Sequence, residues 1–189
     1  MRSVKIRGEE FKFCCAHFVS YKGFRERLHG HNYTVEVELS GAVSPSDGYV
    51  IDFGVIKKKL REICKQLNER VIIPMKSDTL KINVIVNNNT VEKKETFSLC
   101  ETTTQEEQDE NEIKGQVEIT VLDSFFSFPK SDCALLPIQF STAEELSTYI
   151  SDSLAQSLQA EISERGIRSL TVRVFERPTQ AASYTVDLG

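Results

Sequence analysis

Alternation of apolar and polar residues predicts two long strands near the start of the chain. Residues 4–19 form the first, and one of its faces collects Phe11, Phe13, Cys15 and His17. After a loop at residues 20–27, residues 29–41 alternate again, and one face takes His29, His31, Tyr33, Val35, Val37 and Leu39. Two long strands joined by a loop predict an antiparallel hairpin.

Helical periodicity replaces alternation in two later segments. In residues 54–67 one stripe holds Ile56, Leu60, Ile63, Cys64 and Leu67. In the second segment every fourth residue is apolar, at Leu146, Ile150, Leu154, Leu158 and Ile162. Thr142 or Ser141 can cap this second helix, with Glu144 or Glu145 as the capping-box partner.

Two more strands follow the second helix, which Gly166 ends. They occupy residues 168–178 and 181–188, with a turn at residues 178–180. Two strands, two helices and two strands in this order predict an α+β fold, in which a four-stranded antiparallel sheet carries both helices on one face.

The segment between the helices, residues 78–130, is interpreted as an insertion in a single domain. It contains predicted strands at residues 80–88, 90–99 and 116–124, and the run Asn87 to Asn89 is typical of a hairpin turn. Residues 101–112 carry six acidic residues and no basic one, so we expect an acidic, mobile loop.

Composition narrows the class of protein. The formal net charge of −5 becomes +1 without residues 101–112, so the rest of the chain lacks the basic character of a nucleic-acid-binding protein. No apolar run is long enough to span a membrane and the N-terminus has no secretory signal, so we expect a cytoplasmic protein without membrane contacts. The five cysteines show no CxxC spacing and are expected to be reduced.

The three histidines of the chain all lie within fifteen residues. His29 and His31 share one strand face, and the neighbouring strand can bring His17 beside them. Three neutral imidazoles facing one point favour a catalytic type of zinc site, with a fourth position for water or substrate. Packing histidines without a metal are the alternative interpretation, and Cys15 is either an auxiliary thiolate or a small core residue.

Several motifs occur in an order that resembles a known enzyme family. "CAHF", "LHGHNYTVEVELSG", "GYVIDF", "STAEEL" and "VFERP" are similar to motifs of the 6-pyruvoyltetrahydropterin synthase family, which includes the 6-carboxytetrahydropterin synthases. The resemblance covers about two thirds of the chain, up to about Leu67 and again from about Ser141. It implies the tunnelling fold, in which small antiparallel sheets join into barrels within a homohexamer, a dimer of trimers.

The resemblance also implies roles for individual residues. His17, His29 and His31 would bind zinc, and Glu176 would hold the pterin ring through its N–H and amino groups. Thr142 lies in the motif that makes other pterin contacts, and Glu144 stands at the glutamate of that motif. Without the resemblance, a glutamate near a strand end, such as Glu176, is more often a solvated surface charge than a ligand-binding group.

Two family features are missing from this chain. The typical enzyme has a catalytic Cys in the loop before HGH, and an Asp-His pair after the first helix. Here the loop has no Cys and Glu26 is its only acidic residue, while Asn68 and Glu69 stand in place of Asp-His. Glu26 matches a Glu-for-Cys variant of the family, although that variant keeps the Asp-His pair. A simple pairing of Glu26 with Arg25 or Arg27 is the alternative.

The Glu variant implies retro-aldol-like cleavage of 7,8-dihydroneopterin triphosphate to 6-hydroxymethyl-7,8-dihydropterin. A carboxylate beside a zinc-bound diol is a reasonable base, and Glu69 is a candidate second acid or base. Triphosphate elimination to 6-pyruvoyltetrahydropterin is disfavoured because its Cys and His are missing. The other alternative is a paralogue that binds zinc and pterin without catalysing a reaction.

Overall fold

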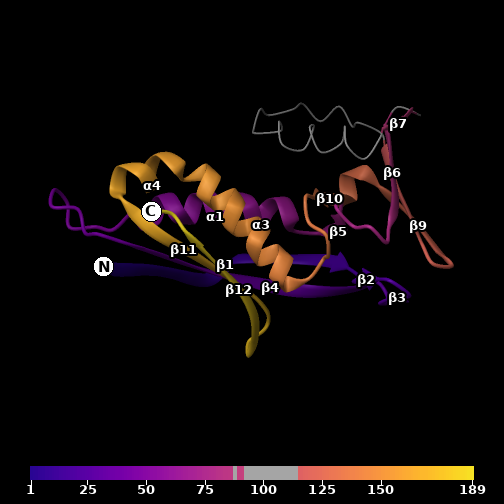
Figure 1. Ribbon diagram of the computed structural model, residues 1–189, viewed down its shortest axis with the longest axis horizontal. Helices are drawn as coiled ribbons and strands as arrows, with labels where there is room; N and C mark the ends of the chain where they lie inside the picture. Colours follow the sequence, from indigo (N-terminus) through magenta and orange to yellow (C-terminus); the bar gives the residue numbers. More distant parts are fainter. Residues whose placement is uncertain (87–88, 92–114) are drawn as a thin grey trace. The chain divides into compact units, whose positions relative to one another are not determined.

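The computed structural model describes residues 1–86, 89–91 and 115–189 of the chain (Figure 1). These residues form two compact units. The first unit comprises Met1–Cys15, Gly30–Asn68 and Thr142–Gly189, and the second comprises Ala16–His29 and Glu69–Ser141.

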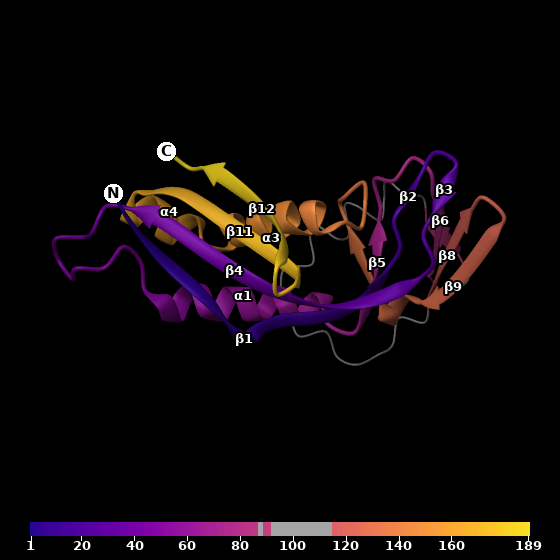
Figure 2. The ribbon, with the colours of Figure 1, turned by 90° about the horizontal axis from the view of Figure 1, so that it is seen from below.

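The first unit holds four neighbouring strands of a six-stranded sheet, two more than predicted, with helices on one face (Figures 1 and 2). Its neighbouring strands follow the order β1 (Arg2–His17), β4 (His29–Gly41), β11 (Ile167–Arg177) and β12 (Gln180–Asp187). The helices are α1 (Phe53–Leu67), α3 (Ala143–Ser157) and α4 (Gln159–Arg165), and α3 packs on β11, β12 and α1. This arrangement confirms the predicted α+β tunnelling fold.

The core of the first unit forms where the predicted strand face meets the predicted helix stripes. The side chains of this core are fully buried: Val35, Leu39, Leu60, Leu67, Leu146, Ile150, Leu154 and Leu170. Burial of each such side chain contributes about 1.5–3 kcal/mol relative to exposure. The shared inward face of β1 and β4 also fixes where the histidines at their ends can point.

The second helical segment differs from its prediction in one respect. We predicted one helix up to Gly166, but the helix is interrupted at Leu158, where ψ turns to 13°. The Ser157 hydroxyl donates to the Leu154 carbonyl at 3.0 Å, a local bond that competes with the helical ladder. Gly166 then ends α4 in the left-handed region, with φ at 58°.

The second unit contains a small antiparallel sheet, a short hairpin and the remaining two strands of the six-stranded sheet, β5 (Arg70–Pro74) and β10 (Cys133–Leu136). The strand order of the small sheet is β7 (Asn89–Val91), β6 (Lys81–Val86), β8 (Gly115–Val121) and β9 (Ser124–Pro129). β5 pairs in parallel with β10, which follows the 3-10 turn η1 (Lys130–Asp132). β2 (Ser20–Tyr21) and β3 (Phe24–Arg25) form a short hairpin inside the segment predicted as a loop.

The predicted strands of the inserted segment have mixed outcomes. β6 and β8 confirm the strands predicted at residues 80–88 and 116–124. Most of the predicted strand at 90–99 and the whole acidic loop at 101–112 lie outside the described residues, as do two of the three residues of the Asn turn. The domain boundaries, one domain with an insertion at about 78–130, stay a prediction.

Within the part of the chain that the structure describes, no helix is both long enough and apolar enough to cross a bilayer.

Candidate metal centre

The three predicted ligands come together in the structure. His17 at the end of β1 and His29 and His31 at the start of β4 offer ring nitrogens that all lie within 4.8 Å of one another. His17 is buried, His31 is partly buried and His29 is exposed. Among the described residues, this is the group of His, Cys, Asp or Glu side chains with the spacing to hold a metal ion.

Two of the imidazoles are oriented by main-chain carbonyl groups. His17 Nδ1 lies 2.6 Å from the Ser141 carbonyl oxygen, and His29 Nδ1 lies 2.8 Å from that of Arg27. A carbonyl oxygen only accepts, so each Nδ1 carries the proton and each Nε2 carries the lone pair with which an imidazole binds a metal. The donor set therefore fits zinc, which neutral histidines bind in catalytic sites.

Ser141 is a residue of this centre that the sequence interpretation treated only as a possible helix cap. Its hydroxyl donates to the Phe18 carbonyl at 2.7 Å while its own carbonyl accepts from His17. Ser141 is 1% exposed, so both bonds are shielded from water. The only sequence signal was its place directly before the Thr142 cap.

Glu176 lies against the histidine group, and its pterin role stays a prediction. Its Oε1 is 2.7 Å from His31 Nε2, but the two groups are not aligned as a hydrogen bond, so the contact does not assign the His31 tautomer. The pairing of β11 with β12 shifts register between Phe175 and Arg177, which places Glu176 at a β-bulge. Bulges commonly re-aim a side chain beside a functional site.

Glu26 forms hydrogen bonds with Val19, at the start of its own loop. Its main-chain N–H donates to the Val19 carbonyl at 2.9 Å, and its Oε2 accepts from the Val19 N–H at 3.0 Å. Arg25 donates from Nη1 to the Glu26 carbonyl at 2.8 Å. The side chain is therefore held by the backbone, three residues before His29.

Asn68 and Glu69 have different surroundings at the end of α1. Asn68 Oδ1 accepts from the Cys14 N–H at 2.9 Å, so this amide links the helix to β1. Glu69 is exposed and has φ at 58°, in the left-handed region that non-glycine residues seldom occupy. The structure shows Glu69 as a strained, solvent-facing residue, and a catalytic role for it stays a prediction.

The remaining predicted residues lie at the start of α3 and on β1. Thr142 is the N-cap of α3, and its hydroxyl accepts from the Glu145 N–H at 3.4 Å. Glu144 is exposed in the first turn. Burial raises the pKa of the Cys15 thiol to about 12, which favours a small core residue over a thiolate.

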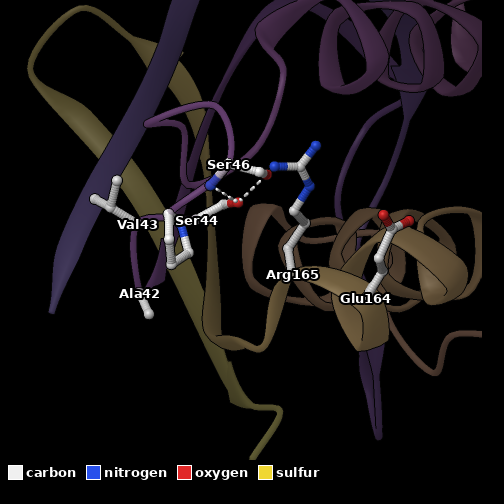
Figure 3. Close-up of a pocket in the computed structure, with 7 residues that line it drawn as sticks. Ala42, Val43, Ser44, Ser46, Glu164 and Arg165 are labelled. Atoms are coloured by element: carbon white, nitrogen blue, oxygen red, sulfur yellow. Dashed lines mark hydrogen bonds between the residues drawn. The ribbon is translucent and has the colours of Figure 1, made fainter.

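A second hollow in the first unit contains none of these residues (Figure 3). It has a volume of about 230 Å³ and lies between the loop after β4 and the end of α4. Arg165 donates to Asp47 at 2.6 Å, and the Tyr49 N–H and Arg165 together hold the pKa of Asp47 below its usual range. Arg165 of this hollow is paired with Asp47, and the lining contains no histidine or cysteine, so it has no chemistry comparable to that of the histidine group.

Three convergent imidazoles on two strands, with a carboxylate from a third strand beside them, define a tunnelling-fold protein with a histidine group that could hold a metal ion. The chain matches the family model described as 6-pyruvoyl tetrahydropterin synthase over residues 6–187. It therefore belongs to the 6-pyruvoyl tetrahydropterin synthase family, a family of lyases that act on small pterins, depend in general on a metal and are generally oligomeric.

Solved and curated relatives agree with this assignment. The Plasmodium vivax 6-pyruvoyl tetrahydropterin synthase superimposes with a TM-score of 0.79 at 36% identity, covering 99% of this chain and 98% of that one. The Plasmodium falciparum enzyme gives 0.79 at 34% identity with the same coverage. A Methanocaldococcus jannaschii protein provisionally named 6-carboxy-5,6,7,8-tetrahydropterin synthase is 27% identical over 173 residues, 92% of this chain and 88% of its own. Two further Plasmodium vivax structures replace a catalytic glutamate, by alanine and by cysteine.

Proposed function

We propose that the protein is a zinc-dependent lyase that converts 7,8-dihydroneopterin triphosphate to 6-hydroxymethyl-7,8-dihydropterin, with Glu26 as the base. The observation that carries this proposal is the loop before HGH, where the usual Cys is absent and Glu26 is the only acidic residue. The similar Plasmodium vivax enzyme has a catalytic glutamate, which supports a carboxylate as the base in this chain too.

Glu26 would start the reaction by removing the proton of the second side-chain hydroxyl. That oxygen becomes a carbonyl as the bond between the first and second side-chain carbons breaks. The electron pair moves to the first carbon and into the conjugated ring imine, and the protonated Glu26 can return the proton to this carbon. The products are 6-hydroxymethyl-7,8-dihydropterin and glycolaldehyde triphosphate.

The other site residues would bind and orient the substrate. His17, His29 and His31 would hold zinc, which supplies Lewis acidity that lowers the pKa of the side-chain hydroxyls. Glu176 would accept from the ring N–H and amino group as a planar two-point acceptor. Thr142 and Glu144 are proposed to complete the pterin pocket, and Glu69 is a proposed second acid or base.

A non-catalytic zinc- and pterin-binding protein is the second candidate. It is favoured by the position of Asn68, whose side chain bonds to the Cys14 backbone where the typical family member has part of a proton relay. Elimination of triphosphate to 6-pyruvoyltetrahydropterin lacks both its Cys and its His in this chain.

Product analysis separates these functions. The zinc-loaded protein is incubated with 7,8-dihydroneopterin triphosphate, and the pterins are identified by chromatography and mass spectrometry. A 6-hydroxymethyl product is expected. A pyruvoyl product would replace our proposal by the elimination reaction, and retained pterin binding without turnover would replace it by the non-catalytic function.

A glutamine at position 26 tests the base directly. Glu26→Gln is expected to keep zinc and pterin binding but to lose at least about 100-fold in turnover, because an amide cannot accept the proton. Glu9→Gln, at an exposed glutamate of β1, is the matched control. Turnover equal to that of the wild type would remove Glu26 from the mechanism.

We also infer a cytoplasmic homohexamer, a dimer of trimers, as the family resemblance implies. β12 stands at the end of the strand order of the first unit, and edge strands of small sheets need partners. Light scattering after gel filtration should give about 128 kDa, six times the chain mass of 21.4 kDa. A mass of one chain at micromolar concentration would contradict the hexamer.

A further inference from the structure

The residues that hold Glu26 in place belong to a contact between its loop and the sheet of the second unit. Residues 18–27, here named the Glu26 loop, include the β2–β3 hairpin, and side chains of the loop contact Phe126 of β9. The loop is closed by the two hydrogen bonds between Val19 and Glu26. Because Oε2 of Glu26 is one of the bonded atoms, the direction of the carboxylate depends on the geometry of this closure.

Arg25 connects the hydrogen-bonded pair Val19 and Glu26 to aromatic side chains. Its Nη1 donates to the Glu26 carbonyl, and its guanidinium carbon lies 5.3 Å from the centre of the Phe126 ring and 5.9 Å from that of Phe18. These distances are within the range of a cation–π contact. The planar cation is thereby fixed by one hydrogen bond and two rings.

Phe126 provides the support from β9. Its ring stacks on Phe18 at 5.2 Å between centroids and on Phe128 at 6.0 Å. Phe18 belongs to the buried hydrophobic cluster of the second unit, and Phe126 packs against that cluster. The other side of the loop is held by Thr79, whose hydroxyl donates to the Ser20 carbonyl at 3.3 Å.

We propose that Arg25 and Phe126 are positioning residues for Glu26, so that the β8–β9 hairpin serves as the support of the catalytic loop. This inference rests on the proposed function, since it gives Glu26 the role of base. The β8–β9 hairpin, which lies in the segment predicted as an insertion, would then have a functional role. It would hold the Glu26 carboxylate so that Oε1, the oxygen not bonded to Val19, can receive the proton. Small errors in the direction of the carboxylate reduce turnover more than they reduce binding.

The hairpin offers its own control. Phe125 and Phe126 are adjacent on β9, but Phe125 is 61% exposed whereas Phe126 lies against Phe18 and Arg25. Phe126→Leu removes the ring and keeps an apolar side chain, Phe126→Tyr keeps the ring, and Phe125→Leu makes the same change at the exposed neighbour. Arg25→Met removes the guanidinium without touching β9, so it tests the same support should Phe126→Leu fail to fold.

Two readouts are measured on the full-length, zinc-loaded protein. In Phe126→Leu and Arg25→Met, amide hydrogen exchange at Val19 and Glu26 should rise about ten-fold, because the closure opens more often. The kcat with 7,8-dihydroneopterin triphosphate should fall about ten-fold at unchanged zinc content, with KM changing less than about two-fold. Phe126→Tyr and Phe125→Leu should match the wild type in both.

The readouts separate failure of this inference from failure of the proposed function. Wild-type exchange in both Phe126→Leu and Arg25→Met would overturn the support by the hairpin, whatever the turnover. Faster exchange with unchanged kcat would overturn the positioning role. If the wild type has no turnover, the proposed function and with it the positioning of a base are rejected, and exchange alone then decides whether the hairpin supports the loop.

Discussion

Glu176 stands beside His31, one of the three convergent histidines. Its carboxylate is 2.7 Å from His31, and its side chain keeps 35% of its surface exposed, so one edge faces the imidazole while another is accessible to a ligand. In the proposed function a pterin bound to Glu176 would present its side chain toward the histidines. Ring recognition and the metal centre would then share this residue.

Replacing Glu176 by glutamine should separate its proposed role in pterin binding from any effect on metal binding. An amide has one acceptor oxygen and no charge, so Glu176→Gln should weaken binding of 7,8-dihydroneopterin by about ten-fold or more, while zinc content stays near that of the wild type. Fluorescence titration of the pterin and metal analysis are the measurements. Glu164→Gln, at an exposed residue of α4, is the control. Unchanged pterin affinity would show that Glu176 is a surface charge.

At the residue scale, the sequence predicted the candidate site side chains better than it predicted the hydrogen-bond partners that orient them. The HxH spacing with His17 on the neighbouring strand indicated the ligand group, because strand geometry puts alternate residues on one face. The support of His17 by Ser141 and of Glu26 by Val19 was not predicted. Both supports use main-chain atoms, whose partners depend on how distant segments pack and leave no mark on residue type.

Among the elements, β1, β4 and β11 are joined by charged side chains as well as by backbone pairing. Arg173 Nη1 donates to Glu36 at 2.9 Å and to Glu38 at 3.1 Å, and Lys5 lies 3.4 Å and 3.5 Å from the same two carboxylates. The hydrogen bond from Arg173 is the main cause that lowers the pKa of Glu38, against the opposing effect of burial. A lowered carboxyl pKa stabilises the fold above the ordinary value and loses this effect as pH falls through the lowered value.

Glu38→Gln should therefore change the acid side of the stability profile. At pH 7 the variant should lose up to about 1 kcal/mol of unfolding free energy, because the pair with Arg173 is only partly shielded. The difference between the two proteins should shrink as the pH falls from 4.5 toward 3 and Glu38 takes up a proton. Urea unfolding at pH 7 and at pH 3 measures this, with Glu9→Gln as the control, since the Glu9 side chain is 92% exposed. A constant difference between pH 7 and pH 3 would contradict the assignment.

Long elements with one buried face were predictable, and short ones were not. β4 and α1 match their predictions within one residue because a single buried face governs each pattern. β9 was missed because Phe125 and Phe126 are adjacent and point to opposite sides, which hides the alternation. β5 and β10 are only five and four residues long, and their pairing is non-local. The break between α3 and α4 contains no Gly or Pro, and the local hydrogen bond of Ser157 beside it is not visible in the apolar pattern.

For the whole molecule, zinc bound to histidines from β1 and β4 should couple metal binding to stability. A ligand that binds only the folded state stabilises it, by about 2.7 kcal/mol at one hundred times its Kd. Removing zinc with a chelator should therefore lower the thermal midpoint by several degrees, and added zinc should restore it. Differential scanning calorimetry with parallel metal analysis provides the measurement.

The His29→Ala variant provides the comparison for the chelator experiment. It removes an exposed ligand with little effect on packing, and its midpoint should not respond to chelator. A wild-type midpoint that is the same with chelator and with added zinc would contradict a metal at this centre. The three histidines would then be packing residues.

The carbonyl groups that orient His17 and His29 also affect how this centre tolerates mutation. Every residue type at positions 27 and 141 brings the same carbonyl oxygen, so a missense change there alters a side chain and leaves the imidazole acceptor in the chain. Substitutions other than proline at the exposed position 27 can therefore keep the acceptor of His29, whereas position 141 also carries the buried hydroxyl bond to Phe18. Insertions, deletions and prolines, which displace the backbone itself, are the changes against which the centre has no such protection.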